Sequence, residues 1–162
     1  MLDFKNVYQN MPEQIAEGIK SLWADEGALS DAESMQKRLQ EVVYVAVDPA
    51  TGSVAAVSTA VKKKVHALNG KFLYEFRCYI GEAFRIAGLD VKLSRLTFDF
   101  LEQLASADAD QPIGIFAVLG NDYLKDQPLW RRAVWPEIEM YFIGYNKNGD
   151  PIRVHYFTGA RI

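Results

Sequence analysis

Residues 78–93 read CYIGEAFRIAGLDVKL, and they form the most informative segment of the sequence. It begins as the end of a β-strand, continues as a short loop that contains Gly88, and becomes an amphipathic helix. A helix start presents backbone N–H groups without partners and the positive end of the helix dipole. Such a loop can hold a phosphate or pyrophosphate, and Gly88 lets the backbone approach a ligand closely. A single glycine before a helix is also ordinary turn chemistry, so the spacing leaves both interpretations open.

Three strands precede this loop. Residues 42–47 are a β-rich apolar run, and residues 53–66 form a long strand that begins with small side chains. Asn69 and Gly70 then make a strong hairpin signal, and residues 71–80 form the third strand. The sequence therefore predicts antiparallel strands directly before the loop.

Two helices come before these strands. Apolar residues at helical spacing predict the first over residues 12–23. Ser30 resembles an N-cap, and Glu33 three residues later completes a capping box, so a second helix is expected to run to about Glu41.

The second half of the chain mixes helices and strands. We expect a helix over residues 90–105, an uncharged buried strand over 113–119 and a short helix over 121–134. Strands over 137–145 and 152–157 follow, joined by a polar hairpin loop. The order is two helices, three strands, then helix, strand, helix and two strands. This order predicts an α/β fold with a mixed, mostly antiparallel sheet and helices on both faces.

Composition narrows the class of protein. The 162 residues suit a single domain over residues 1–162, with no internal linker. A net charge of −3 and a pI near 5.4 argue against nucleic acid as a partner. The one cysteine, Cys78, allows no intrachain disulfide and indicates a cytoplasmic protein, and no apolar stretch is long enough for a membrane span. His66 and His155 lie in predicted strands far apart, so no metal site is expected.

The order of elements and the segment quoted above resemble the GNAT superfamily, the acyl-CoA-dependent N-acyltransferases. The acyl-CoA motif of that family is Gln/Arg-x-x-Gly-x-Gly/Ala, and residues 85–90 stand in its place. Arg85 and Gly88 match the motif, Ile80 fills the apolar position at the strand end, and Phe84 fills the aromatic position before the motif. The resemblance implies a GNAT-like fold and transfer of an acyl group, most simply from acetyl-CoA, to a small-molecule or peptide amine.

The resemblance also implies how acyl-CoA would be held. Backbone N–H groups of the loop would bind the pyrophosphate, and backbone groups near Cys78 and Ile80 would bond the pantetheine arm and the thioester carbonyl. The implied cofactor-binding residues are Cys78, Ile80, Arg85, Ile86, Ala87, Gly88, Leu89, Asp90 and Asn121.

Two carboxylates are candidate general bases, because the attacking amine must lose a proton. Members of the family often supply this base as a Glu on the central strands or through a water molecule, and Glu75 and Glu82 are the carboxylates nearest that place. Glu75 has an alternative role as the partner of Arg77 or of a lysine among residues 62–64 in a cross-strand ion pair. Glu82 has an alternative role as a solvated side chain at the strand end.

The family's acid is a tyrosine that follows an asparagine after the fifth strand. Asn121 matches the asparagine, but Pro128 occupies the tyrosine position, and Tyr123 is the nearest substitute. Asp90 also departs from the motif, since it stands where the family has Gly or Ala. Asp90 has an alternative role as the N-cap of the following helix.

These two departures favour a second hypothesis, a non-catalytic GNAT-fold module that binds a ligand or a protein. A third hypothesis, nucleic-acid binding by the lysines of residues 62–64, conflicts with the acidic pI. Trp130, Trp135 and Tyr141 form an aromatic group near the last strands that suits core packing, a substrate-binding wall or a dimer surface. A homodimer is therefore a further expectation.

Overall fold

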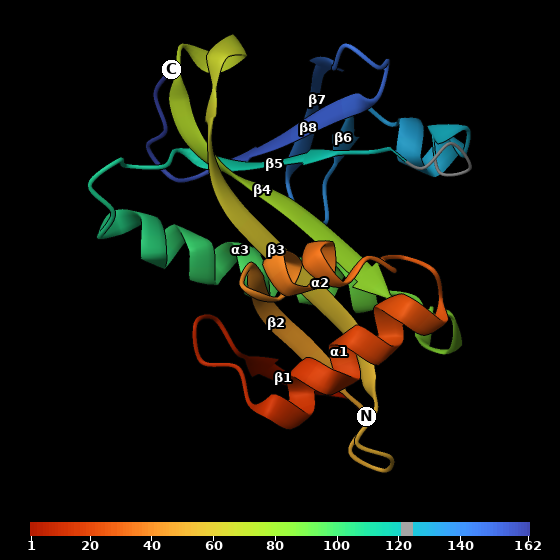
Figure 1. Cartoon of the computed structure of the whole chain (residues 1–162). Coiled ribbons are helices and arrows are strands. Elements are labelled where there is room, and N and C mark those ends of the chain that lie inside the picture. The colour runs from red at the N-terminus through yellow and green to blue at the C-terminus, as the bar shows by residue number, and fades with distance from the viewer. Residues whose placement is uncertain (121–124) are drawn as a thin grey trace. The chain divides into compact units, whose positions relative to one another are not determined.

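The computed structural model describes residues 1–120 and 125–162 (Figure 1). The helices and strands are β1 (Asp3–Asn6), α1 (Glu13–Asp25), α2 (Ala32–Leu39), β2 (Val42–Val47), β3 (Val54–Val65), η1 (His66–Leu68), β4 (Lys71–Ile80), η2 (Glu82–Phe84), α3 (Leu89–Ser106), β5 (Gly114–Val118), η3 (Pro128–Arg131), β6 (Val134–Trp135), β7 (Met140–Tyr145) and β8 (Pro151–Tyr156).

The described strands form one eight-stranded sheet in the order β1-β2-β3-β4-β5-β8-β7-β6. β4 and β5 are parallel, whereas β1–β2, β2–β3, β5–β8, β7–β8 and β6–β7 are antiparallel pairs. The mixed, mostly antiparallel sheet that the sequence predicts is thus confirmed. The chain also divides into two compact units. Unit 1 comprises residues 1–60 and 77–97, and unit 2 comprises residues 61–76 and 98–162.

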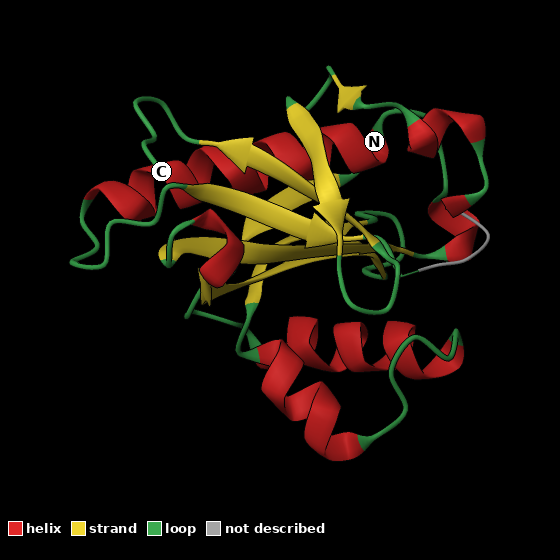
Figure 2. Cartoon of the chain, turned by 90° about the horizontal axis from the view of Figure 1, so that it is seen from above, coloured by secondary structure: helices red, strands yellow, loops and turns green. Residues whose placement is uncertain are grey.

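Unit 1 has helices on both faces of its strands. Figure 2 shows α1 and α2 on one face and the first half of α3 on the other. Ile19 and Trp23 of α1 are buried against β2 and β3 in a cluster that includes Val45. On the opposite face, Leu93 of α3 packs in a cluster that includes Ala46. Successive strand residues point to opposite faces, so β2 and β3 serve both cores at once.

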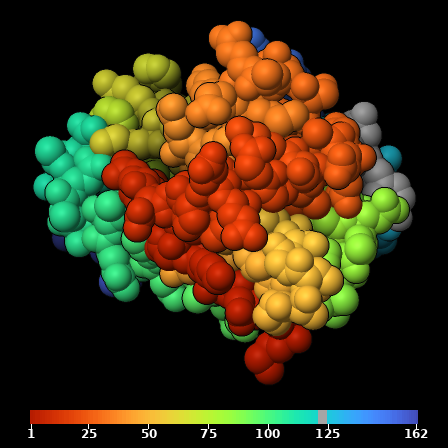
Figure 3. Space-filling view, turned by 60° about the horizontal axis from the view of Figure 1, so that its bottom comes forward, coloured from red at the N-terminus to blue at the C-terminus, as the bar shows by residue number. Residues whose placement is uncertain are grey.

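Helix α1 is amphipathic and has a well-defined end. Its buried residues lie four positions apart. Residues of the N-terminal segment that contains α1, coloured red and orange in Figure 3, lie on the surface in that view. Gly27, at φ +70°, follows the helix in the left-handed conformation that glycine adopts readily. The N–H of Ala28 then donates to the carbonyl of Trp23 at 2.9 Å. This bond closes the helix end onto a buried anchor.

Unit 2 is also packed on both faces of its strands. Leu68, Leu73 and Val154 are buried together on one face. On the other face the rings of Phe76 and Phe98 meet edge to face, with centroids 5.0 Å apart.

Arg153 fastens the last part of unit 2. Its side chain is 2% exposed and donates a hydrogen bond to the carbonyl of Trp130 at 2.7 Å. The guanidinium also lies 4.0 Å from the ring centroid of Trp135. Burial lowers the pKa of Arg153. These contacts tie η3 and β6 to β8.

Two features at the N-terminal end differ from the sequence prediction. β1 was not expected, because four residues of mixed polarity give no strand signal, yet it pairs with β2. The N-cap of α2 is Asp31 rather than Ser30, because the Asp31 carboxylate accepts the N–H of Ser34 at 2.8 Å.

Two further predictions need correction. Part of the helix predicted over residues 121–134 lies outside the described residues, and the remainder holds η3 and β6 instead of a continuous helix. Pro128 explains this change, because proline supplies no N–H to a helix interior and is tolerated only in a first turn. His66 begins the short helix η1 and is not in a strand.

Replacing Leu93 with alanine should lower the free energy of unfolding by about 3 kcal/mol, because Leu93 is fully buried and the change leaves a cavity. The matched control is Leu129→Ala, which removes the same atoms from a side chain that is 57% exposed and should cost less than about 0.5 kcal/mol. Denaturant unfolding measures both values. Equal losses would contradict the packing of α3 described here.

Candidate functional site

The β4–α3 loop, residues 81–88, joins the end of the third predicted strand to the start of a long helix. Leu89, the first residue of α3, is only 5% exposed and packs into the core with Leu93. The four residues before it are exposed, and Ile86 is 63% exposed. The helix start is therefore fixed by its buried side while the loop faces solvent.

Backbone donors at this helix start lack partners. Among the residues that the structure describes, the N–H groups of Ala87, Gly88 and Asp90 form no hydrogen bond with the chain. The first helical bond runs from the N–H of Lys92 to the carbonyl of Gly88 at 3.0 Å. Gly88 is therefore the N-cap, and the donors beside it are available to an anion.

The conformation of Gly88 requires glycine. Its φ is +85°, a region that residues with a Cβ rarely adopt. No heavy atom lies within 4 Å of the position that a Cβ would occupy. The backbone is thus open to a ligand from this side.

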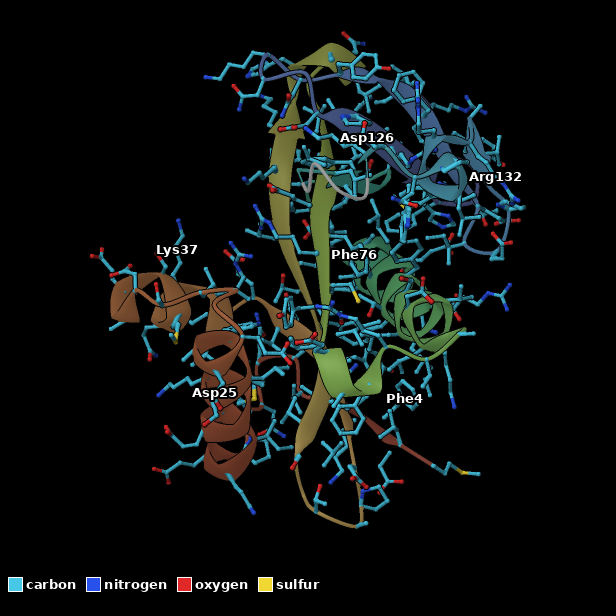
Figure 4. The ribbon with its side chains drawn as sticks, turned by 90° about the vertical axis from the view of Figure 1, so that its right-hand side faces the viewer. Phe4, Asp25, Lys37, Phe76, Asp126 and Arg132 are labelled. Atoms are coloured by element: carbon cyan, nitrogen blue, oxygen red, sulfur yellow. The ribbon has the colours of Figure 1, made fainter. Side chains whose placement is uncertain are left out.

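Charges of both signs surround the loop. Arg85 and Lys92 are exposed cations, and the Lys92 ammonium lies 4.3 Å from the ring centroid of Phe4, which Figure 4 labels. Asp90 is the second residue of α3, so its predicted alternative role as the N-cap is wrong. Its carboxylate still suits the first turn of a helix, where it interacts favourably with the dipole and opposes a bound anion.

Glu26 joins this site, although no sequence pattern had indicated it. The hydroxyl of Tyr79 donates to one Glu26 carboxylate oxygen at 2.7 Å, and the N–H of Glu82 donates to the other at 2.8 Å. The Tyr79 bond, then the Glu82 bond and the charge of Arg85 lower the pKa of Glu26. Burial, together with Glu26, raises the pKa of Tyr79. Sequence reasoning missed Glu26 because no spacing links a helix end to a strand 53 residues later.

Glu75 lies on β4 and is 8% exposed. It forms an ion pair with Lys63, which is the alternative role that the sequence allowed for it. Lys62 bonds Asp108 at 2.8 Å and Asp110 at 2.6 Å, and these carboxylates raise the pKa of Lys62. Two of the lysines that a nucleic-acid site would use are therefore paired with carboxylates.

The remaining predicted site residues differ in their surroundings. Cys78 and Glu82 are exposed, and Ile80 contributes to the core beneath α3. Asn121 and Tyr123 lie outside the described residues.

The described parts of the chain hold no group of three His, Cys, Asp or Glu side chains that could bind a metal. His155 instead packs on Phe98, with ring centroids 5.0 Å apart. Within residues 1–120 and 125–162, every helix is too short or too polar to span a bilayer.

Neither a protein family model nor a curated protein matches the sequence. Solved structures do match the fold. A GNAT superfamily phosphinothricin acetyltransferase from Sinorhizobium meliloti, in complex with AcCoA, gives a TM-score of 0.68 at 15% identity, over 99% of this chain and 92% of that chain. A mosquito arylalkylamine N-acetyltransferase like 5b gives a TM-score of 0.67 at 12% identity, over 97% of this chain and 100% of that chain.

The ribosomal-protein-S5-alanine acetyltransferase from Vibrio fischeri gives a TM-score of 0.66 at 10% identity, over 99% of this chain and 96% of that chain. At such identities, likeness establishes the fold and leaves the activity open. The chain has the GNAT fold, as its resemblance to that superfamily had implied.

The acid stability of the protein should depend on Glu26. Because the folded pKa of Glu26 lies below its ordinary value of 4.5, its ionised form stabilises the fold fully above about pH 4.5, and this contribution is lost as the pH falls through the lowered pKa. The gap in unfolding free energy between the wild type and Glu26→Gln should therefore narrow at acid pH. Urea unfolding across the acid range measures the gap, and a gap that stays constant with pH would contradict the two hydrogen bonds.

Proposed function

Starting from the GNAT fold, we propose that this chain is an acyl-CoA-dependent N-acyltransferase that moves an acyl group, most simply acetyl, from CoA to an amine. The observation that carries the proposal is the exposed loop at the start of α3. There, unpaired N–H groups flank Gly88, whose open backbone a ligand can approach. A phosphate or pyrophosphate is a group that such a helix start can bind.

In this proposal the N–H groups of Ala87, Gly88 and Asp90 donate to the pyrophosphate of acyl-CoA. Arg85 and Lys92 add positive charge from exposed positions. Ile86 is exposed beside the loop, and buried Leu89 anchors it. These residues fit the group, although the Asp90 carboxylate in the first turn of α3 opposes its charge.

The thioester would lie along the end of β4. Backbone groups near Cys78 and Ile80 would bond the pantetheine arm and stabilise negative charge that develops on the thioester oxygen. The exposure of Cys78 is consistent with a ligand beside this strand.

Proton transfer needs a base for the amine and an acid for the departing thiolate. We propose Glu75 or Glu82 as the base. Glu75 is buried and ion-paired, whereas the Glu82 side chain is exposed and its backbone is held by Glu26. Tyr123 is the proposed acid, and Asn121 completes the proposed cofactor set.

The acceptor that we propose is a small-molecule or peptide amine. Of the structures that match this fold, one is named an arylalkylamine N-acetyltransferase and another a ribosomal-protein-S5-alanine acetyltransferase. We also propose a single domain over residues 1–162 that works as a cytoplasmic homodimer, with exposed aromatic residues of β7 such as Tyr145, 67% exposed, at the contact.

A second function, a non-catalytic module that binds a ligand or a protein on the same fold, is favoured by one observation. Asp90 lies within the first turn of α3, where its carboxylate opposes a bound pyrophosphate. Turnover of acetyl-CoA in the presence of an amine would exclude this second function.

Titration calorimetry with acetyl-CoA tests the loop. Gly88→Trp should abolish binding, because the indole covers the open backbone. Asp90→Gly should tighten binding about threefold, because a like charge is removed at a helix start. The matched control is Gly52→Trp, since Gly52 also has positive φ and an open Cβ position but lies in the β2–β3 turn. Failure of both the wild type and Asp90→Gly to bind would refute the acyltransferase proposal.

Steady-state kinetics with an amine identified by screening tests the two carboxylates. Removing the base should lower kcat about a hundredfold and leave acetyl-CoA affinity unchanged, as expected for the loss of general base catalysis. Glu75→Gln and Glu82→Gln are the two variants, and one of them should show this loss. If both keep full kcat, neither carboxylate is the base.

A further inference from the structure

The backbone of Glu26 is fixed by hydrogen bonds within α1 and its C-terminal turn. It is the C-cap residue of the helix, with its own N–H bonded to the carbonyl of Leu22 at 3.3 Å. The next residues close the helix end on Trp23, which is 3% exposed in the core of unit 1. The Glu26 carboxylate therefore projects from a hydrogen-bonded helix end rather than from an unpaired loop.

Both oxygens of the Glu26 carboxylate accept hydrogen bonds, one from a residue of β4 and one from a residue just after this strand. One oxygen accepts a hydrogen bond from the hydroxyl of Tyr79, the second-last residue of β4. The other accepts a hydrogen bond from the N–H of Glu82, the first residue of η2. Between them lies Gly81, where an added Cβ would meet Leu22 at 3.0 Å. The hydrogen bonds of Glu26 to Tyr79 and Glu82, which we call the clamp, thus connect the end of α1 to the junction between β4 and the loop.

The clamp extends to Arg85. The charge of Arg85 favours ionised Glu26, and the Arg85 Nε lies 3.4 Å from the carbonyl oxygen of Ile80. Arg85 is the first position of the segment proposed to bind pyrophosphate. A loop whose donors are fixed before binding loses less entropy when the ligand arrives.

We propose that Glu26 is a positioning residue that holds the β4–α3 loop ready for acyl-CoA, so that the end of α1 sets acyl-CoA affinity. This inference rests on the proposed function. Glu26 does not touch the ligand in it, but acts through Tyr79, Glu82 and Arg85.

A purely electrostatic role for Glu26 predicts the opposite change in acyl-CoA affinity when its carboxylate is removed. Acyl-CoA is an anion, so removing a nearby carboxylate should tighten its binding if Glu26 contributed only its charge. If Glu26 positions the loop, its removal should weaken binding despite the lost repulsion. The two roles therefore differ in sign.

The experiment is acetyl-CoA titration calorimetry on the wild type, Glu26→Ala and Asp25→Asn. Asp25 is the matched control, because it removes one negative charge from the exposed neighbouring position at the same helix end (Figure 4). Glu26→Ala should weaken binding about tenfold, the effect of losing one charge-assisted hydrogen bond. Asp25→Asn should bind as the wild type does or slightly tighter. Binding by Glu26→Ala that equals or exceeds the wild type overturns the inference.

Two measurements on the ligand-free protein are independent of activity. Hydrogen exchange of the Glu82 amide should be faster in Glu26→Ala than in Asp25→Asn. Carbon NMR of labelled tyrosine, with Tyr79→Phe to assign the signal, should show that the pKa of Tyr79 falls toward its ordinary value in Glu26→Gln. Unchanged exchange and an unchanged Tyr79 titration would overturn the clamp even if the protein binds acetyl-CoA.

These readouts keep the two proposals separate. If the wild type fails to bind acetyl-CoA, the proposed function fails, while exchange and titration still decide whether Glu26 holds the loop. If Glu26→Ala does not fold, Tyr79→Phe removes one of the two hydrogen bonds and should weaken acetyl-CoA binding several-fold. Tyr79→Phe with unchanged affinity would then count against the inference.

Discussion

The first turn of α3 must satisfy two demands at once. Its apolar side, Leu89 and Leu93, is buried against the alanine-rich face of β2 and β3, and this burial fixes where the helix begins. The N–H groups of Ala87, Gly88 and Asp90, which the helix cannot satisfy internally, are left without partners in the described chain. The core therefore places a helix start with unpaired N–H groups at the end of β4, and the proposed chemistry depends on that placement.

The rest of unit 1 supports this helix start from the opposite face. Trp23 anchors α1 in the second core, and the closed end of α1 carries Glu26 to the beginning of the loop. The burial of Trp23 on one face of the strands thus fixes the contact of Glu26 with Glu82 at the end of β4. The two-sided packing of β2 and β3 explains how residues far apart in sequence are brought to one site.

The sequence predicted most of the strands, because apolar runs such as residues 42–47 and the Asn69–Gly70 turn are local signals. It also located the loop at Gly88. It could not predict β1, whose short mixed sequence becomes a strand only by pairing with β2. The Glu26 contacts were equally hidden, because they depend on tertiary packing rather than spacing. Asp31 displaced Ser30 as a cap since both residue types suit that position equally well.

The proposed function depends on binding of acyl-CoA by the backbone at the start of α3. Amide NMR of the protein during addition of acetyl-CoA measures this binding residue by residue, because each backbone N–H gives its own signal. We expect saturable shifts that are largest for the amides of Ala87, Gly88 and Asp90. Saturable binding that leaves these three amides unmoved, or no binding at all, would contradict a cofactor site at this helix start.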